Sequence, residues 1–198
     1  MPRPSRRDHL VTTAISLFCK HGFHATGIDR ILETAGVSKK TMYEHFRTKE
    51  ELIMAALRQY DSQFRNYFMR EVEKTGTTPR EKLLAVFDVA HAWFSQNNFF
   101  GCVFINAVGE YSEIDSPIRA ISREFKSMMR GYIEKLAGEA GAPDPKELAS
   151  ELSLLLEGAI VTARVSHLPT AAHTAKKMAK VIMAHELPEP RRSKSAST

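Results

Sequence analysis

The sequence predicts an all-α protein of about nine helices, and three observations lead to this prediction. Apolar residues recur at intervals of three and four along most of the 198 residues, which is the period of an α-helix. Capping residues, several followed by proline, precede most of these runs. No segment alternates apolar and polar residues for long enough to indicate a strand. We divide the chain into a small N-terminal unit at 1–50, a larger bundle at 51–186 and a disordered tail at 187–198.

The first helix is expected to follow residues 1–4, which we expect to be disordered. Ser5 and Asp8 can form a capping box at its start, since the serine side chain can accept from a backbone N–H three residues later. Gly22 ends the helix, after about His21. Its apolar face consists of Leu10, Val11, Ala14, Ile15, Leu17 and Phe18.

Two short helices joined by a tight turn are expected next. Thr26 can cap the first of them, over about 27–34, with Asp29 as its capping-box partner. Gly36 ends this helix, because a residue without a Cβ adopts the left-handed conformation most easily. The spacing therefore predicts a helix-turn-helix arrangement.

The second helix of this pair is expected over about 39–46, with Ser38 as its cap. Met42 and Phe46 are four residues apart and can face the core. The other positions present two lysines, a hydroxyl, a phenol and an imidazole to solvent. A short helix with such a surface suits the major groove of DNA.

A long helix is expected from Thr48 to about Lys74, with Glu51 as the capping-box partner of Thr48. A helix of about 25 residues spans about 38 Å, so it can connect two distant sites. Lys49 near its N-terminus is unfavourable with the helix dipole, which attracts anions there. A nearby phosphate would remove that conflict.

Five further helices are expected in the rest of the chain. Thr78-Pro79-Arg80-Glu81 is a strong start signal, because it combines a cap, a proline in the first turn and a capping-box glutamate. The apolar segment 99–111 is ambiguous between strand and helix, and we assign it as helix because its surroundings are helical. The other helices are expected over about 117–140, 145–167 with Asp144 as cap, and 171–186 with Thr170 as cap.

The run from Thr26 to Leu52, TGIDRILETAGVSKKTMYEHFRTKEEL, resembles the DNA-binding signature of the tetracycline-repressor (TetR) family of bacterial regulators. The matching features are Ala-Gly-Val at 35–37, a hydroxyl and a lysine at 38–39, Tyr43-x-x-Phe46 and Lys49-Glu-Glu-Leu52. The resemblance covers roughly residues 5–55. An ordinary pair of helices with solvated lysines is the alternative interpretation. The resemblance implies an operator in double-stranded DNA, a small-molecule effector and a homodimer formed through helices at about 146–167 and 170–186.

On this interpretation, Lys39, Lys40 and Thr41 reach base edges or adjoining phosphates, while Tyr43, His45 and Lys49 bind the DNA backbone. The DNA-binding set is completed by Thr26, Gly27 and Ser38. Positive charge is concentrated in the same unit: residues 1–50 hold 9 Lys/Arg and 5 Asp/Glu, out of a net charge of +5 for the chain. The N-terminal arginines, Arg3, Arg6 and Arg7, either enter the minor groove or only solvate the chain end.

The bundle is the expected effector unit, because large apolar side chains with a few polar groups suit a ligand cavity. Plain core packing is the alternative for each of them. Asn106 and Glu110 share a helical face, and either bind a ligand or bond to neighbouring backbone. The segment with Gly-Cys and Asn-Ala-x-x-Glu at 101–110 resembles a TetR subgroup, whose ligands the motif does not define. The candidate ligand-binding residues are Phe64, Phe68, Phe87, His91, Phe94, Cys102, Asn106, Glu110 and Met128.

The remaining features exclude several classes of protein. No run approaches the ~18 apolar residues of a membrane span, and the basic N-terminus lacks the apolar region of a signal peptide. The two cysteines, Cys19 and Cys102, are too few for a disulfide scaffold, so a cytoplasmic protein is expected. No catalytic or cofactor motif is present, and His21 and His24 lack a third metal ligand. We therefore expect no enzyme, cofactor or metal.

The predicted function is a repressor that a small apolar or amphipathic effector releases from a palindromic operator. Two alternatives stay open. In one, Cys102 is a thiol that senses oxidants or electrophiles, which requires access and a lowered pKa. In the other, the protein binds DNA without any effector, and a filled bundle core would favour that alternative.

Overall fold

The computed structural model describes residues 5–188, and this part of the chain folds into nine α-helices without a strand. The all-α prediction is confirmed. In chain order the helices are α1 (Arg6–His21), α2 (Ile28–Ala35), α3 (Lys39–His45), α4 (Lys49–Thr75), α5 (Pro79–Phe94), α6 (Val103–Glu110), α7 (Pro117–Glu139), α8 (Pro145–Ser166) and α9 (Ala171–Glu186).

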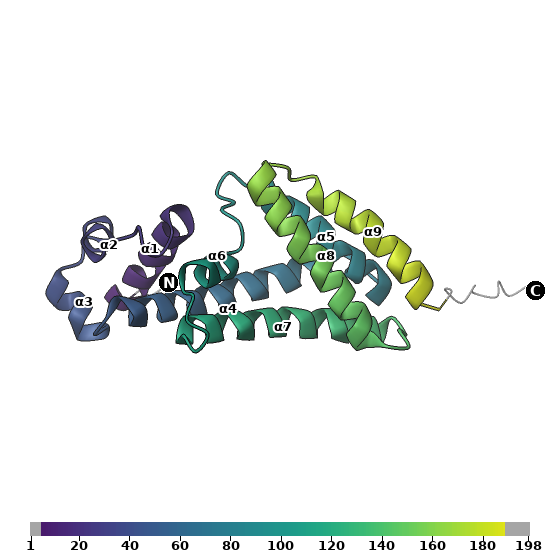
Figure 1. The fold of residues 1–198 in the computed structure, drawn as a ribbon, viewed down its shortest axis with the longest axis horizontal. Coiled ribbons are helices and arrows are strands. Elements are labelled where there is room, and N and C mark those ends of the chain that lie inside the picture. The colour runs from purple at the N-terminus through teal and green to yellow at the C-terminus, as the bar shows by residue number, and fades with distance from the viewer. Residues whose placement is uncertain (1–4, 189–198) are drawn as a thin grey trace, which may run out of the picture.

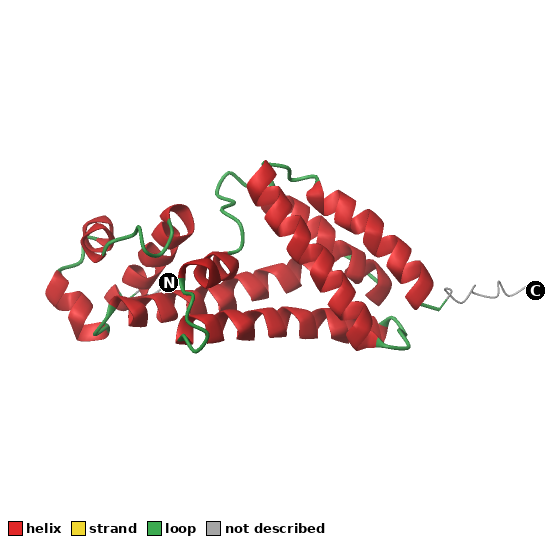
Figure 2. Ribbon diagram, viewed as in Figure 1, coloured by secondary structure: helices red, strands yellow, loops and turns green. Residues whose placement is uncertain are grey.

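The helices form a small unit at one end and a larger bundle at the other, joined by the continuous helix α4 (Figure 1). Helix α1 packs on the N-terminal part of α4 and contacts α2 and α3. Helix α7 runs along the other part of α4, and α5, α8 and α9 complete the bundle (Figure 2). The short helix α6 lies between the two groups (Figure 1). None of the helices within residues 5–188 has both the length and the apolarity that crossing a bilayer requires.

Most of the predicted helix starts are confirmed by their side-chain caps. The side chains of Ser5, Ser38, Thr48 and Asp144 accept backbone N–H groups at the starts of α1, α3, α4 and α8. The prediction for Thr26 was wrong, and the prediction for Thr170 holds for the cap position only. Gly27 occupies the cap position of α2 without a side-chain hydrogen bond, and Thr170 precedes α9 in helical backbone geometry without one.

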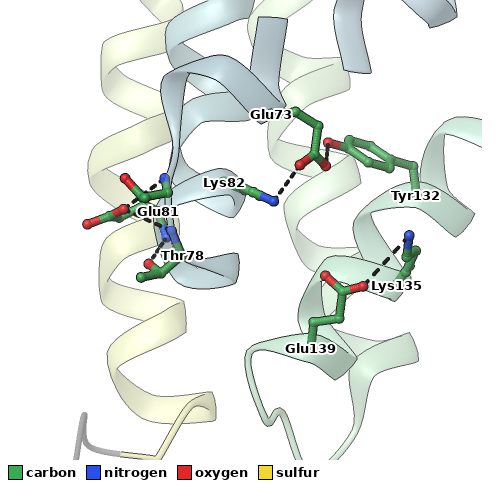
Figure 3. Close-up of polar contacts among 8 residues, drawn as sticks. Glu73, Thr78, Glu81, Lys82, Tyr132, Lys135 and Glu139 are labelled. Atoms are coloured by element: carbon green, nitrogen blue, oxygen red, sulfur yellow. Dashed lines mark hydrogen bonds and ion pairs between the residues drawn. The ribbon is translucent and has the colours of Figure 1, made fainter. Parts of the chain in front are cut away.

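The far end of α4 is attached to α5 and α7 by a polar cluster (Figure 3). The Tyr132 hydroxyl donates to Glu73 at 2.9 Å, and Lys82 forms an ion pair with the same carboxylate. The Lys82 ammonium, assisted by the Tyr132 hydroxyl, lowers the pKa of Glu73, whereas burial and this carboxylate raise the pKa of Tyr132. Beside it, Thr78 and Glu81 form the capping box of α5. The end of α4 is therefore held on two sides.

The core is continuous and its centre is aromatic. The rings of Phe104 and Phe125 stack with centroids 3.9 Å apart, and Phe64 lies 4.7 Å from Trp93. The core also includes Leu187, which is 5% exposed. Arg80 donates to the carbonyl oxygen of Pro188 at 3.1 Å. The predicted tail therefore begins two residues too early, because Leu187 and Pro188 contact the bundle; residues 189–198, like the predicted disorder at 1–4, lie outside the described part.

Candidate nucleic-acid interface and effector site

Helix α3 presents a polar face away from the rest of the protein. Met42 is fully buried beneath it and anchors it to the core. The Ser38 hydroxyl accepts from the backbone N–H of Thr41 at 3.1 Å and defines where the helix begins. The exposed residues of this face are Ser38, Lys39, Lys40, Tyr43 and His45, with Thr41 half-buried beside them. A short exposed helix with lysine, hydroxyl and phenol side chains is of the kind that enters major grooves.

Thr26 and Gly27 lie at the start of α2, but only Gly27 is exposed. The side chain of Thr26 is fully buried, and its hydroxyl donates to the carbonyl oxygen of Gly22 at 2.6 Å. The Thr26 side chain therefore braces the loop between α1 and α2 and cannot reach DNA from this position. Gly27 remains available to a phosphate through its backbone.

Lys49 has a partner that the sequence did not indicate. Its ammonium donates to the carbonyl oxygen of Phe23 at 2.7 Å, and the residue is half-buried. The carbonyl oxygen of Phe23 therefore accepts a hydrogen bond from the cation near the N-terminus of α4. Lys49 ties α4 to the loop between α1 and α2.

Glu110 binds the same loop from the opposite unit. Its carboxylate accepts the backbone N–H of Phe23 at 2.8 Å and that of His24 at 2.6 Å. Gly22 has a φ of +87°, and a Cβ there would lie 2.9 Å from Glu110 Oε1. The Tyr111 ring packs 4.9 Å from the His24 ring. Of the two interpretations of Glu110, these contacts support the bond to neighbouring backbone, and they connect α6 to the DNA-binding unit.

Asn106 likewise has a backbone partner, since its side-chain amide donates to the carbonyl oxygen of Phe100 at 3.3 Å. His91 stacks on His173 with centroids 4.0 Å apart. Phe87 and Phe94 are core residues, at 0% and 4% exposure. These four residues, together with Glu110 and Met128, line none of three cavities in or beside the bundle.

Three of the cavities formed by residues 5–188 lie in the bundle or at its edge. The first, called the α6–α8 groove, measures about 710 Å³ and lies between α6, α7 and α8; its lining includes Phe104, Val108, Arg123, Lys126, Arg130, Ser153 and Glu157. The second, called the aromatic cavity, measures about 30 Å³ and shares Phe104, Lys126 and Glu157 with the groove. The third measures about 500 Å³ and lies between α1, α4 and residues 96–101.

Three of the predicted ligand residues line these cavities. Phe64, Phe68 and Cys102 line the aromatic cavity, and Phe64 also lines the third cavity. The charged residues of the α6–α8 groove were missed, because on a helix such residues resemble an ordinary solvated face. Lys126 of α7 pairs with Glu157 of α8, and because 31 residues separate them, no local sequence pattern indicates this ion pair.

Neither cysteine is exposed to solvent, since Cys19 is half-buried and Cys102 is buried. Burial, together with the nearby Cys102, raises the pKa of the Cys19 thiol to about 12. Cys102 itself is 5% exposed. Among residues 5–188, no three His, Cys, Asp or Glu side chains are placed to hold a metal ion.

Helices α8 and α9 carry an uncovered apolar face. Val161, Val165 and Leu168 are 46%, 73% and 47% exposed, and Met178 and Val181 of α9 are 51% and 69% exposed. We call these five residues the α8–α9 face. Such a concentration of exposed apolar side chains is typical of an interaction surface.

Comparison with known proteins agrees with this arrangement. A model described as "Bacterial regulatory proteins, tetR family" matches residues 10–56, and one described as "Tetracyclin repressor-like, C-terminal domain" matches residues 79–179. The transcriptional activator FasR of Mycolicibacterium smegmatis is 38% identical over 85 residues, which are 43% of this chain and 38% of FasR. The repressor KstR2 of the same organism is 36% identical over 84 residues, 42% of this chain and 40% of KstR2. The chain thus spans about two fifths of these two relatives.

Solved structures extend the likeness to nearly the whole chain. The TetR-family regulator SCO4454 of Streptomyces coelicolor superposes with a TM-score of 0.84 at 25% identity, covering 91% of this chain and 95% of that one. E. coli NemR in its reduced form has a TM-score of 0.83 at 22% identity, covering 94% and 99%, and shows a common fold. Since the two family models together match both the α3-containing unit and most of the bundle, this chain belongs to the TetR family of bacterial transcriptional regulators.

Proposed function

We propose that this protein is a homodimeric repressor that binds a palindromic operator and is released by a small amphipathic effector. The observation that carries the proposal is the polar face of α3, which is exposed, while Met42 on the opposite side of the helix is buried in the core. Lys39, Lys40 and Thr41 would contact base edges or adjoining phosphates, and Tyr43 and His45 the backbone. We place the boundary between the two units at residues 50–51, inside α4.

The α8–α9 face supports the dimer. One helix-turn-helix unit makes few contacts, and two units one DNA turn apart multiply them. Pairing of this face with its copy would bury the five exposed apolar side chains and place two α3 helices on one duplex. The TetR family binds DNA as homodimers.

The α6–α8 groove supports an effector, because a volume of about 710 Å³ is that of a small-molecule site. It favours a ligand-responsive regulator over a DNA-binding protein without an effector. Phe104, Ile105 and Val108 of α6 form one wall, and Glu110 at the end of the same helix binds the loop between α1 and α2. A ligand that prefers another position of α6 would therefore change the spacing of the two α3 helices.

The thiol-sensing alternative has less support, because Cys102 is buried beside aromatic residues and Cys19 has a raised pKa. The Cys102→Ser variant distinguishes thiol sensing from effector binding. If oxidants affect operator binding by this variant as they affect the wild-type protein, Cys102 is not the sensor.

Selection of binding sites from random duplex DNA with the purified protein tests the proposal. We expect an enriched palindrome whose half-sites lie about one helical turn apart. A promoter–reporter fusion carrying that sequence should then be expressed more strongly when the protein is deleted. Enrichment of no sequence, or expression that falls on deletion, would contradict DNA-specific repression.

A further inference from the structure

The α6–α8 groove combines an apolar wall with an excess of positive charge. Phe104, Ile105, Val108 and Leu154 supply the apolar part. The charged residues of the lining are Arg123, Lys126, Arg130 and Glu157, so three cations face one carboxylate and the net charge is +2. A cleft with one sign of charge and apolar walls concentrates ligands of the opposite sign.

Lys126 and Glu157 form the central polar contact of this groove. The Lys126 ammonium lies 2.6 Å from both carboxylate oxygens of Glu157, and the side chains are 29% and 35% exposed. The same ammonium lies 5.7 Å from the centroid of the Phe125 ring. Because both residues also line the aromatic cavity, this ion pair separates the open groove from the apolar interior.

Ser153 and Arg130 are among the polar residues of the lining that have no protein partner within residues 5–188. The Ser153 hydroxyl is buried without a hydrogen bond. Arg130 forms no ion pair in the same part of the chain. A buried hydroxyl without a partner is costly, so a bound acceptor would be favoured there.

From these contacts we infer that the groove binds an amphipathic organic carboxylate, with its head group at Lys126 and its apolar body against Phe104, Ile105 and Leu154. The inference rests on the proposed function, since it names the chemical class of that effector. Glu157 binds the Lys126 ammonium and would compete for it with the carboxylate of the ligand. A neutral apolar ligand of the same length gains nothing from the lysine.

The competition between Glu157 and the ligand makes the test specific. Lys126→Gln and Glu157→Gln break the same ion pair, but the first should lower and the second should raise the affinity of the groove for an anion. We measure binding of octanoate and of octanamide, its neutral counterpart, by isothermal titration calorimetry on the full chain. We expect the wild-type protein to bind octanoate about tenfold more tightly, as charge-assisted hydrogen bonds are stronger than neutral ones. Lys126→Gln should abolish this preference, and Glu157→Gln should increase it.

Lys135→Gln and Glu139→Gln are matched controls, because they break another ion pair of α7, at 3.7 Å, outside the groove. They should leave both affinities unchanged. Equal affinities for octanoate and octanamide, parallel weakening by the two groove variants, or no binding of either compound would overturn the inference. Operator binding is measured by fluorescence anisotropy on the same samples. If the protein binds the operator but does not prefer octanoate, the ligand class is contradicted. If it does not bind the operator, the proposed function is contradicted.

Discussion

Glu110 and His24 are joined by two hydrogen bonds, although 86 residues separate them. Glu110 Oε2 accepts the backbone N–H of His24 at 2.6 Å, and the Nε2 atom of His24 lies 2.8 Å from the carbonyl oxygen of Glu110. The last residue of α6 is therefore bound to the loop that leads into α2. Lys49 binds the same loop from α4 through the carbonyl oxygen of Phe23.

Replacing Glu110 by Gln should loosen this loop. An amide has one acceptor oxygen, so one of the two N–H groups now bound at 2.8 and 2.6 Å would lose its partner. We expect the unfolding free energy to fall by about 1–2 kcal/mol, and amide exchange at Phe23 and His24 to accelerate about tenfold. Hydrogen exchange followed by NMR measures both amides. Glu113→Gln is the control, since that residue is exposed; unchanged protection in the Glu110 variant would contradict the contact.

Lys40→Ala should alter DNA recognition without altering stability. Lys40 is exposed on α3, so we expect its removal to change the unfolding free energy by less than about 0.5 kcal/mol. If Lys40 contacts a base edge, binding to the selected operator should weaken by about 1–3 kcal/mol, and the preference at one position of each half-site should relax. Repeated site selection measures the preference. The exposed Lys20 at the end of α1 is the control, and an unaltered preference in the Lys40 variant would argue against base reading.

Lys49→Ala should lower stability without altering the sequence preference of DNA binding. Its ammonium donates to the Phe23 carbonyl oxygen at 2.7 Å, so its loss should cost about 1–2 kcal/mol of unfolding free energy. DNA affinity should fall alike for all sequences, because the loop rather than a base contact is disturbed. Urea unfolding and anisotropy with operator and random duplexes measure these effects. Full stability combined with a salt slope lowered by about 1 would instead assign Lys49 to a phosphate.

The contrast between these lysines shows what the sequence could predict. Helix starts such as Ser38 and Thr48 were predictable, because a cap and its partner lie within three residues. The exposure of Lys40 followed from the helical spacing of Met42 and Phe46. The partners of Lys49 and Glu110 were not predictable, since they lie 26 and 86–87 residues away and depend on how the units pack.

Thr26 illustrates the same limit within a local motif. The pattern at residues 26–29 matches a capping box, but the threonine hydroxyl donates to the Gly22 carbonyl oxygen, and the helix begins without a side-chain cap. Packing of Thr26 into the core decided between the two hydrogen bonds. The groove was missed for a related reason, because the pairing of Lys126 with Glu157 appears only when α7 and α8 pack together.

Val165→Glu should separate the proposed homodimer. Val165 is 73% exposed on the α8–α9 face, and pairing this face with its copy would bury two like charges. We expect a monomer in sedimentation velocity, near-normal folding, and operator binding that becomes weak and non-cooperative. Ile114→Glu is a matched control, because Ile114 is 72% exposed in the loop between α6 and α7. A Val165 variant that remains dimeric would place the interface elsewhere.

Glu151 on α8 should make stability depend on pH in an unusual direction. Burial raises the pKa of Glu151, and Glu186 and Glu147 add to the effect, while its Oε2 atom is buried without a partner among residues 5–188. A raised carboxyl pKa favours the protonated form in the folded state. The contribution of Glu151 to the unfolding free energy is therefore most favourable below the unfolded pKa and is lost as pH rises through the folded pKa.

Glu151→Gln should raise the unfolding free energy by at most about 1 kcal/mol at pH 8, with a smaller gain near pH 4. Urea unfolding at the two pH values, with Glu113→Gln as control, measures this; a variant that unfolds more readily at pH 8 would mean that the charged form is stabilised in the folded protein.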